Sequence, residues 1–393
     1  MKKTIKDFDL FNKKVIIRVD FNVPIKNGVI TDDTRIKASL KTINYALDNN
    51  AKVILMSHLG KVKEASDLIK NDLYPVSVRL GELLNKSILF SNSTRGEELE
   101  ELVKNMQSKD ILLIQNTRYE DLDGKKESSC DLELSRYWAS LGDIFINDAY
   151  GTSHREHASN VGISKYLPSG LGFLVEEEVD KIDSIMNEDT NPFVVIMGGA
   201  KVSDKIKVIE NLIQKCDKLI IGGGMAYTFL KAKDINIGSS LLDNDSIDFC
   251  KKMLELHSDK IILPIDHVVS TSLDSNITNI KDINDTNNDE MGLDIGPKTI
   301  EKYTNILECA KRVIINGPMG CFENELYQNG TKSIYDFLTT NNIKTLVGGG
   351  DSAASVNKLS DKNKFYHIST GGGATLEYLE GKILPGIASI NDK

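Results

Sequence analysis

The chain has 393 residues, about two to three times the length of a typical domain, so we expect two domains, each with its own core. Its 48 Lys+Arg against 57 Asp+Glu give a net charge of −9, which argues against a nucleic-acid or anionic-membrane binding protein. The positive charge is unevenly spread, because seven of the eight arginines lie in the first 155 residues. We therefore expect any small anion bound by guanidinium groups to lie in the first half.

The amino-terminal segment predicts a cytoplasmic protein. Its longest apolar run is Val15–Ile17, far too short for a signal peptide, and Leu219–Leu230 is interrupted by glycines and too short to span a bilayer. The five cysteines include no C-x-x-C pair, which favours unpaired thiols in a reducing compartment. We expect neither a membrane nor a nucleic acid as partner.

Short runs of consecutive apolar residues recur along the chain, separated by enough residues for a helix. Consecutive rather than alternating apolar positions are typical of strands buried on both faces of a parallel sheet. The predicted strands are Val15–Val19, Val53–Met56, Ile111–Ile114, Ile144–Ile146, Phe193–Met197, Leu219–Ile221, Ile261–Leu263, Val313–Ile315, Thr345–Val347 and Phe365–Ile368. Helical spacing lies between them, as in Val202, Ile206, Ile209 and Ile213. The pattern predicts two open α/β domains.

The boundary between these domains is expected between Leu167 and Pro192, where an acidic helical stretch can connect them. We place the first domain at 1–170, a linking helix at 171–190 and the second domain at 191–373. Residues Ser270–Asp289 are rich in Asn, Asp, Ser and Thr without periodicity, which predicts a surface excursion.

Ligands of open parallel sheets bind beyond the carboxyl ends of the strands. In the first half these ends carry hydrogen-bonding side chains: Asp20, Asn22, His58, Lys61, Asn116, Arg118, Asp148, His154 and Arg155. Arg118 and Arg155 follow buried strands and are as consistent with anion binding as with structure, whereas Arg79, Arg95 and Arg136 fit a solvated surface. His154 and His157 lack the spacing of a metal motif. The first half predicts an anion clamp.

In the second half the strand ends carry glycine, which lets backbone N–H groups approach phosphate oxygens. The clusters are Gly198-Gly199, Gly222–Gly224, Asn316–Pro318, Gly348–Gly350 and Gly371–Gly373. Each is also compatible with a simple tight turn. Lys201 and Lys205, expected on the first turns of a helix, would repel each other unless they share an anion, although Asp204 also fits a solvated face. Asp351 is an acid inside a glycine turn, which predicts Mg²⁺ between it and a phosphate.

Two common nucleotide-binding motifs are absent or incomplete in this chain, which narrows the possible classes of enzyme. The chain has no G-x-x-x-x-G-K-[ST], which excludes a P-loop protein. Gly348–Ala353 fits G-x-G-x-x-A, but the next strand ends at Ser369-Thr370 where a dinucleotide enzyme needs an acid for the ribose. A nicotinamide dehydrogenase is disfavoured.

Taken in order, several segments resemble the phosphoglycerate kinase family across nearly the whole chain. They are Arg18–Pro24, Ser57–Gly60, Asp148–Thr152, Gly198–Lys205, Gly292–Pro297, Gly348–Ser352 and Ser369–Gly373. The resemblance implies a monomer with two Rossmann-like parallel-sheet lobes joined by a hinge helix around a central cleft. It also implies that the tail, 374–393, packs back on the first lobe. The implied reaction is reversible, Mg²⁺-dependent phosphoryl transfer between 1,3-bisphosphoglycerate and ADP, which gives 3-phosphoglycerate and ATP.

Carried over by position, the resemblance implies a site in each lobe. The triose phosphate would be held by Asp20, Phe21, Asn22, Arg35, His58, Leu59, Gly60, Lys61, Arg118 and Arg155. The nucleotide would be held by Gly199, Lys201, Lys205, Gly223, Gly292, Pro318, Glu323, Gly349, Gly350, Asp351 and Ser352, with Glu323 on the ribose and Asp351 on Mg²⁺. Lys61 departs from the family, which most often has arginine there, so a bidentate contact is lost.

The expected chemistry needs no general base, because the attacking oxygen is already ionised at neutral pH. It needs in-line positioning and positive charge, which we assign to Arg35, Lys205 and the helix starts at Gly350 and Gly373. Closure around residues 167–192 would bring the lobes together and exclude water. A two-lobed binding protein without chemistry, and another small-molecule kinase, remain alternatives.

Overall fold

The computed structural model describes residues 1–393, which divide into two compact units. Unit 1 comprises Met1–Asp180 and Ile383–Lys393, and unit 2 comprises Lys181–Lys382. The division falls inside helix α6, Phe173–Asn187. Residues 374–382, which the sequence analysis assigned to a tail on the first lobe, are part of unit 2.

Unit 1 is built on a six-stranded parallel sheet in the order β5-β6-β4-β1-β7-β8. The strands are β1 Lys14–Val19, β4 Lys52–Met56, β5 Leu89–Ser91, β6 Ile111–Ile114, β7 Ile144–Asp148 and β8 Ser169–Leu171. Residues 15, 17 and 19 of β1 pack against helices on one face of the sheet, so Ile16 and Arg18 point to the other face. Both faces are buried, as consecutive apolar runs predict.

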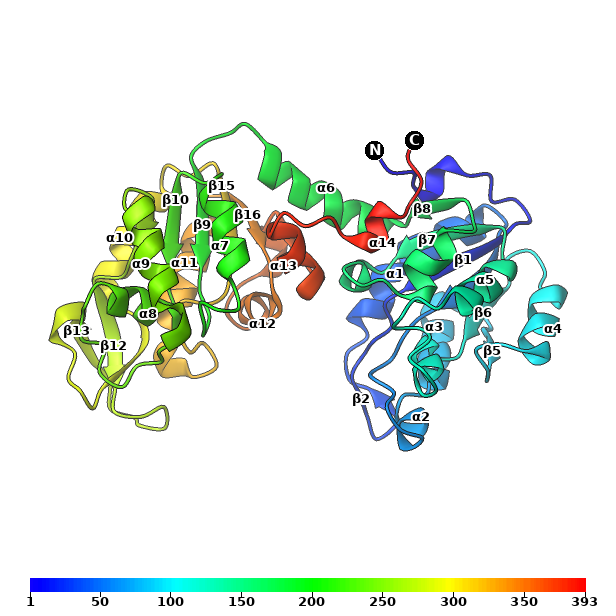
Figure 1. The fold of residues 1–393 in the computed structure, drawn as a ribbon, viewed down its shortest axis with the longest axis horizontal. Coiled ribbons are helices and arrows are strands. Elements are labelled where there is room, and N and C mark those ends of the chain that lie inside the picture. The colour runs from blue at the N-terminus through cyan, green and yellow to red at the C-terminus, as the bar shows by residue number, and fades with distance from the viewer. The chain divides into compact units, whose positions relative to one another are not determined.

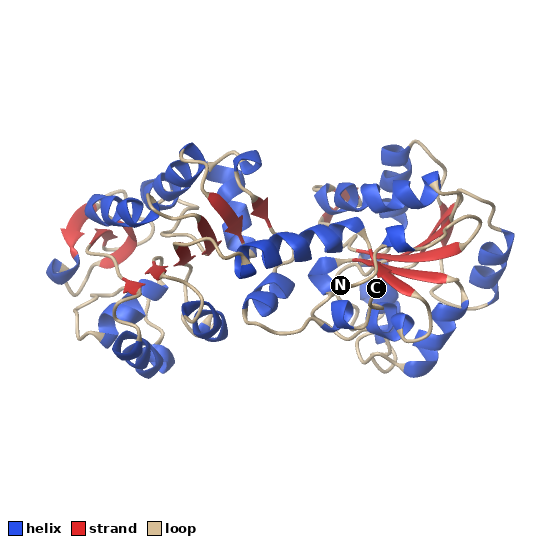
Figure 2. Ribbon diagram, turned by 90° about the horizontal axis from the view of Figure 1, so that it is seen from above, coloured by secondary structure: helices blue, strands red, loops and turns tan.

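Helices cover both faces of this sheet, as Figure 2 shows for the strands near the two termini. Apolar residues of α1 and α3 at helical spacing, among them Ile36, Ile43, Val76 and Leu80, share one core with the strands. The helices of unit 1 are α1 Thr34–Asp48, α2 Ser66–Lys70, α3 Tyr74–Leu84, α4 Glu97–Asn105, α5 Leu132–Ser140 and α14 Pro385–Ala388. A two-stranded hairpin, β2 Ile25–Lys26 and β3 Val29–Ile30, precedes α1.

The last residues of the chain form backbone hydrogen bonds with the first residues. The Lys3 amide donates to the Asn391 carbonyl at 2.8 Å, and the two ends lie side by side in Figure 1. Further along the tail, the Gly386 amide donates to the Ser153 carbonyl at 2.8 Å, and the Gly386 carbonyl accepts from Asn147 Nδ2 at 2.8 Å. Residues 383–393 therefore complete unit 1 next to the end of β7.

Unit 2 is built on a second six-stranded parallel sheet, in the order β11-β10-β9-β15-β16-β17. Its strands are β9 Phe193–Met197, β10 Lys218–Ile221, β11 Ile261–Ile262, β15 Arg312–Asn316, β16 Lys344–Val347 and β17 His367–Ile368. Its helices are α7 Ile206–Ile213, α8 Met225–Ala232, α9 Ile247–Leu256, α10 Pro297–Leu307, α11 Asn329–Thr340, α12 Gly350–Leu359 and α13 Gly373–Leu379. The predicted class, α/β with two parallel-sheet lobes, is confirmed.

The predicted surface excursion of unit 2 is largely exposed, but it also contains a strand that was not predicted. The segment predicted as a surface excursion contains strand β13, Asn279–Asp282, which joins β12 Asp266–Ser270 and β14 Met291–Ile295 in an antiparallel sheet. The pattern was hidden because β13 is exposed and its residues need not be apolar: Ile280 is 62% exposed. No helix in the structure is both long and apolar enough to cross a bilayer.

Candidate functional site

In each parallel sheet the first strand lies in the middle. Successive strands are added first on one side of it and then on the other, and this change of direction leaves a crevice at the carboxyl ends of the central strands. In unit 1, β1 lies between β4 and β7, so the segments after these strands converge. In unit 2, β9 lies between β10 and β15, with the same result. Most of the predicted site residues follow strands of these two sheets, whereas Arg35 lies in α1 and Gly292 in β14.

The segment after β1 is held by side chains at the neighbouring strand ends. The Asp20 carboxylate forms an ion pair with Arg35 at 2.8 Å, and Asn22 Oδ1 accepts from the Gly60 amide at 2.9 Å. The buried Phe21 donates its amide to Ser57 Oγ. This places five predicted residues, Asp20, Phe21, Asn22, Arg35 and Gly60, together, with the Arg35 side chain 43% exposed.

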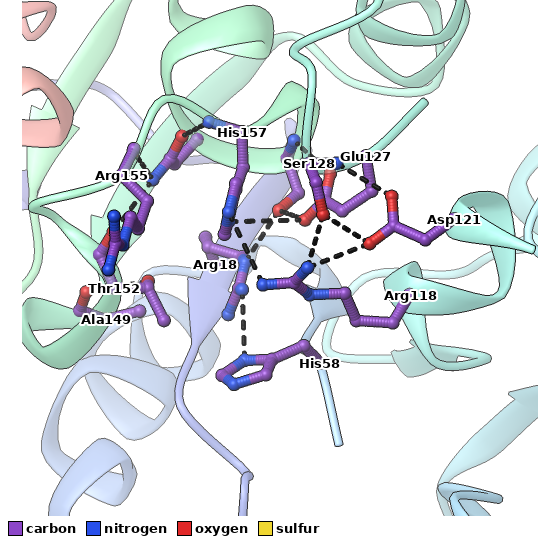
Figure 3. Close-up of polar contacts among 12 residues, drawn as sticks. Arg18, His58, Arg118, Asp121, Glu127, Ser128, Ala149, Thr152, Arg155 and His157 are labelled. Carbon is purple, nitrogen blue, oxygen red and sulfur yellow. Dashed lines mark hydrogen bonds and ion pairs between the residues drawn. The ribbon is translucent and has the colours of Figure 1, made fainter. Parts of the chain in front are cut away.

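A cluster of two arginines and two histidines lies next to them, drawn in Figure 3. Arg118 Nη1 pairs with Asp121 Oδ2 at 2.8 Å and also contacts Ser128 Oγ. Arg118 Nη2 lies 3.4 Å from His157 Nε2, and Arg18 Nη2 lies 3.3 Å from His58 Nδ1. We call Arg18, His58, Arg118 and His157 the cationic cluster.

The histidines of the cationic cluster are held neutral. Burial, with Arg18 and Arg118 nearby, puts the pKa of His58 well below its usual range. Burial, followed by Arg118 and Arg18, lowers the pKa of His157 to about 3. At physiological pH, positive charge therefore comes from the guanidinium groups, while the imidazoles act as neutral hydrogen-bonding groups.

Sequence reasoning missed two members of this cluster. Neither Arg18 nor His157 was among the predicted site residues, yet both are buried and face the predicted residues His58 and Arg118. A signal existed for Arg18, since it is the one charged residue inside the apolar core of β1. Nothing in the sequence pattern marked His157.

The other arginines of the first half lie outside this cluster. Arg79 pairs with Asp33 at 2.8 Å, Arg95 with Glu120 at 3.1 Å, and Arg136 stacks over the Tyr166 ring. Arg155 is exposed and lies near enough to the cationic cluster to act on His157. Lys61 is exposed, and its carbonyl accepts from Asn71. Leu59 is buried, clamped through both its amide and carbonyl by Asn116.

In unit 2 the glycines bring backbones into close approach. A Cβ on Gly198 would lie 2.1 Å from the Pro318 carbonyl oxygen, and one on Gly223 would lie 2.6 Å from the Gly199 amide nitrogen. These glycines are required where the loops after β9, β10 and β15 cross. The Gly317 amide donates to Ser352 Oγ at 2.6 Å, which ties the β15 loop to the start of α12.

Lys205 lies at the centre of these loops. Its Nζ donates to the Asn316 carbonyl at 2.8 Å and also to Asn316 Oδ1. Burial lowers the pKa of Lys205 to about 8, partly offset by Asp351 and Asp204. The expectation that Lys201 and Lys205 lie on the first turns of a helix is wrong: α7 begins at Ile206, so Lys205 directly precedes it and Lys201 is exposed in the loop before it.

A cavity of about 400 Å³ opens beside these loops. The predicted nucleotide residues among its walls are Gly199, Gly223, Gly292, Pro318, Glu323 and Asp351. Its other walls include apolar side chains such as Leu241, Met291 and Phe322. Lys201, Lys205, Gly349, Gly350, Ser352 and Gly373 do not line it; Gly349 caps α12, and Gly373 begins α13.

The cavity and its rim fit a magnesium–nucleotide complex. Asp351 is exposed in the first turn of α12, and no three His, Cys, Asp or Glu side chains gather to form a metal site made of protein alone. Mg²⁺ is commonly held by one or two carboxylates together with substrate phosphates and water. The single carboxylate of Asp351, at the rim of the cavity and the start of α12, would fit such a donor set together with a bound phosphate.

Comparison with known proteins gives one consistent family. The family model described as phosphoglycerate kinase matches residues 5–382. The chain is 55% identical to the phosphoglycerate kinase of Enterococcus faecalis and 53% identical to one of Staphylococcus aureus, each over 100% of both chains. The solved phosphoglycerate kinase of Coxiella burnetii superposes with a TM-score of 0.91 at 35% identity, covering 99% of this chain and 98% of that one. The one of Pyrococcus horikoshii gives 0.83 at 30% identity, covering 98% of each. The chain therefore belongs to the phosphoglycerate kinase family.

Proposed function

We propose that this chain transfers a phosphoryl group between 1,3-bisphosphoglycerate and ADP, with the triose phosphate bound by unit 1 and the nucleotide by unit 2. The observation that carries the proposal is the pairing of two different ligand sites on one chain. Unit 1 has a cationic cluster with neutral histidines, and unit 2 has a glycine-walled cavity next to Lys205.

The chemistry of unit 1 suits a small phosphorylated acid. Arg118, Arg155 and Arg35 supply the charge, and His58 and Asn22 supply neutral hydrogen bonds for hydroxyl or carboxylate oxygens. Asp20 holds the Arg35 guanidinium at 2.8 Å and presents its own carboxylate to a hydroxyl donor. Lys61, which replaces the usual arginine, adds charge without a planar pair of donors.

The chemistry of unit 2 suits a nucleoside di- or triphosphate. The apolar walls of the cavity fit a base, and Glu323 can accept hydrogen bonds from ribose hydroxyls. The amino-terminal end of α12, with Gly349, Gly350 and Ser352, presents backbone donors to phosphate. Asp351 would hold Mg²⁺, which neutralises phosphate charge when bound.

For the transfer itself, the chain supplies positioning and positive charge. The acceptor carboxylate or phosphate oxygen is already ionised, so no side chain needs to remove a proton. Arg35 from unit 1 and Lys205, Gly350 and Gly373 from unit 2 would surround the transferring group. Because these groups belong to separate units, the reaction requires the units to close, and we assign the hinge to the region of α6. We further propose that the enzyme acts as a cytoplasmic monomer.

The direct test is product formation. The purified chain is incubated with MgATP and 3-phosphoglycerate while the acyl phosphate product is trapped, and ADP is measured. We expect ADP only when both substrates and Mg²⁺ are present, and a higher KM for MgATP, with an unchanged KM for 3-phosphoglycerate, in Asp351→Asn. Binding of both ligands without ADP would instead indicate a two-lobed binding protein.

A further inference from the structure

Glu127 is a fully buried carboxylate of unit 1 that lies beside the cationic cluster and belongs to no predicted site. It sits in the segment between the short helix Thr117–Asp121 and α5, close to Arg18 and Arg118. Burying a charge without a compensating partner costs free energy of folding. The groups that contact Glu127 therefore indicate the role of this carboxylate.

Both oxygens of Glu127 are engaged by one residue of a neighbouring turn. Ser159 Oγ donates to Glu127 Oε1 at 2.5 Å, and the Ser159 amide donates to Oε2 at 2.9 Å. The same Ser159 Oγ accepts from Arg18 Nε at 2.8 Å. Because the serine hydroxyl gives its proton to Glu127, its lone pairs are left for Arg18. Glu127 thus orients the guanidinium that faces His58.

The same segment reaches the second arginine by two routes. Ser128 contacts Arg118 Nη1 through its hydroxyl and donates its amide to Asp121 Oδ1 at 2.8 Å. On the other side, Glu127 Oε1 lies 3.9 Å from His157 Nδ1, while His157 Nε2 faces Arg118. Residues 127 and 128 therefore support both guanidinium groups of the cluster.

These contacts also determine where the histidine protons lie. A guanidinium can only donate, so the ring nitrogen that faces it must accept. His58 Nδ1 accepts from Arg18, which leaves the proton of the neutral ring on Nε2. His157 Nε2 accepts from Arg118, which leaves its proton on Nδ1, the atom that faces the Glu127 carboxylate.

We propose that Glu127 is a positioning residue of the triose-phosphate site: through Ser159 it orients Arg18 against His58, and through its charge it keeps the His157 proton on Nδ1. His58 is then presented to the ligand as a neutral Nε2–H donor beside fixed guanidinium groups. The assignment of the ligand rests on the proposed function, whereas the orientation of the cluster rests on the contacts alone.

The test compares Glu127→Gln with a matched variant, Glu120→Gln. Glu120 is also a buried acid of unit 1 that accepts from a hydroxyl, Thr94 Oγ1 at 2.5 Å, and pairs with an arginine, Arg95, outside the cluster. We expect Glu127→Gln to raise the KM for 3-phosphoglycerate about tenfold and to leave the KM for MgATP within about twofold, since supporting contacts of a ligand residue commonly matter at this scale. Glu120→Gln should leave both constants unchanged.

A second measurement does not depend on activity. Long-range ¹⁵N–¹H NMR of the histidine rings distinguishes the two neutral tautomers in the full-length protein. We expect Nε2–H for His58 and Nδ1–H for His157 in the wild type, and a smaller Nδ1–H fraction of His157 in Glu127→Gln, where only the Arg118 contact still favours it. Ser159→Ala, which keeps the acid, should raise the triose-phosphate KM while leaving the His157 tautomer unchanged.

The proposal is overturned if the two Gln variants change the KM for 3-phosphoglycerate equally, or if the His157 tautomer is the same with and without the Glu127 charge. If Glu127→Gln does not fold, the wild-type tautomers and Ser159→Ala decide the matter. A wild-type chain that forms no ADP would refute the proposed function, but the tautomers would still show whether Glu127 positions the cluster.

Discussion

Lys205 is expected to make the free protein less stable than it would be with an apolar residue at this position. Burial lowers the pKa of Lys205 from 10.5 to about 8, and a shift of this size corresponds to roughly 3 kcal/mol of lost stability at pH 7. Hydrogen bonds to a charged group contribute about 1.5–3 kcal/mol each, so the contacts with the Asn316 carbonyl and Oδ1 recover much of this loss. We therefore expect Lys205→Met to be at least as stable as the wild type at pH 7, with a gain of up to about 2 kcal/mol, while abolishing phosphoryl transfer.

The pH dependence of this gain identifies its origin. Because the folded pKa lies below the unfolded one, the unfolded state binds more protons between about pH 8 and 10.5, and wild-type stability rises across that window. The advantage of Lys205→Met should shrink by roughly 2 kcal/mol between pH 7 and pH 9.5.

The assay is urea unfolding of the full chain at both pH values, with fluorescence and circular dichroism followed in parallel to separate the two units. Lys207→Met, which removes an exposed lysine of α7, is the control and should show no such pH-dependent gain. A Lys205→Met protein that is less stable than wild type at pH 7, with a difference that does not change by pH 9.5, would refute the reasoning.

Three further outcomes are expected. Arg35→Ala should lower kcat about 100-fold or more while nucleotide affinity, measured by calorimetry, is kept, because the lost charge acts on the transferring group; unchanged turnover would rule out this role. Gly198→Ala should destabilise unit 2 by about 1–3 kcal/mol, since its Cβ would lie 2.1 Å from the Pro318 carbonyl oxygen; a thermal midpoint equal to wild type would contradict it. Because the pKa of His157 is lowered to about 3 when folded, unit 1 should lose stability as pH falls from about 6.5 toward 3. His157→Gln should flatten that dependence in acid titrations, and an unchanged slope would count against a buried neutral ring.

The sequence predicted the strands that lie at the centre of each sheet because burial on both faces requires consecutive apolar residues. Two short edge strands, β5 Leu89–Ser91 and β8 Ser169–Leu171, were not predicted, because each is only three residues long and includes a serine. The exposed strand β13 was not predicted, because a strand that faces solvent on one side does not need consecutive apolar residues.

In the candidate site, too, some residues could be located from the sequence and others could not. Strand ends such as Asp20 and Asn316 could be located from the sequence, because a parallel sheet brings its carboxyl ends together. Two members of the cationic cluster, Arg18 and His157, could not. Arg18 contacts Ser159, 141 positions later in the chain, and no spacing rule connects such residues. Which arginine serves the site and which is a surface charge depends on these distant partners.

The bonding of residues 383–393 to the first residues of unit 1 has a consequence for synthesis of the protein. A ribosome builds the chain from its amino terminus, at about 5–20 residues per second. Because unit 2 precedes residues 383–393 in the chain, this last segment of unit 1 emerges only after all of unit 2 has been made. Until then, the Ser153 carbonyl and the Asn147 amide beside the end of β7 lack the Gly386 partners that they have in the finished fold. The predicted triose-phosphate site, whose Arg155 lies two residues beyond Ser153, would thus be completed last.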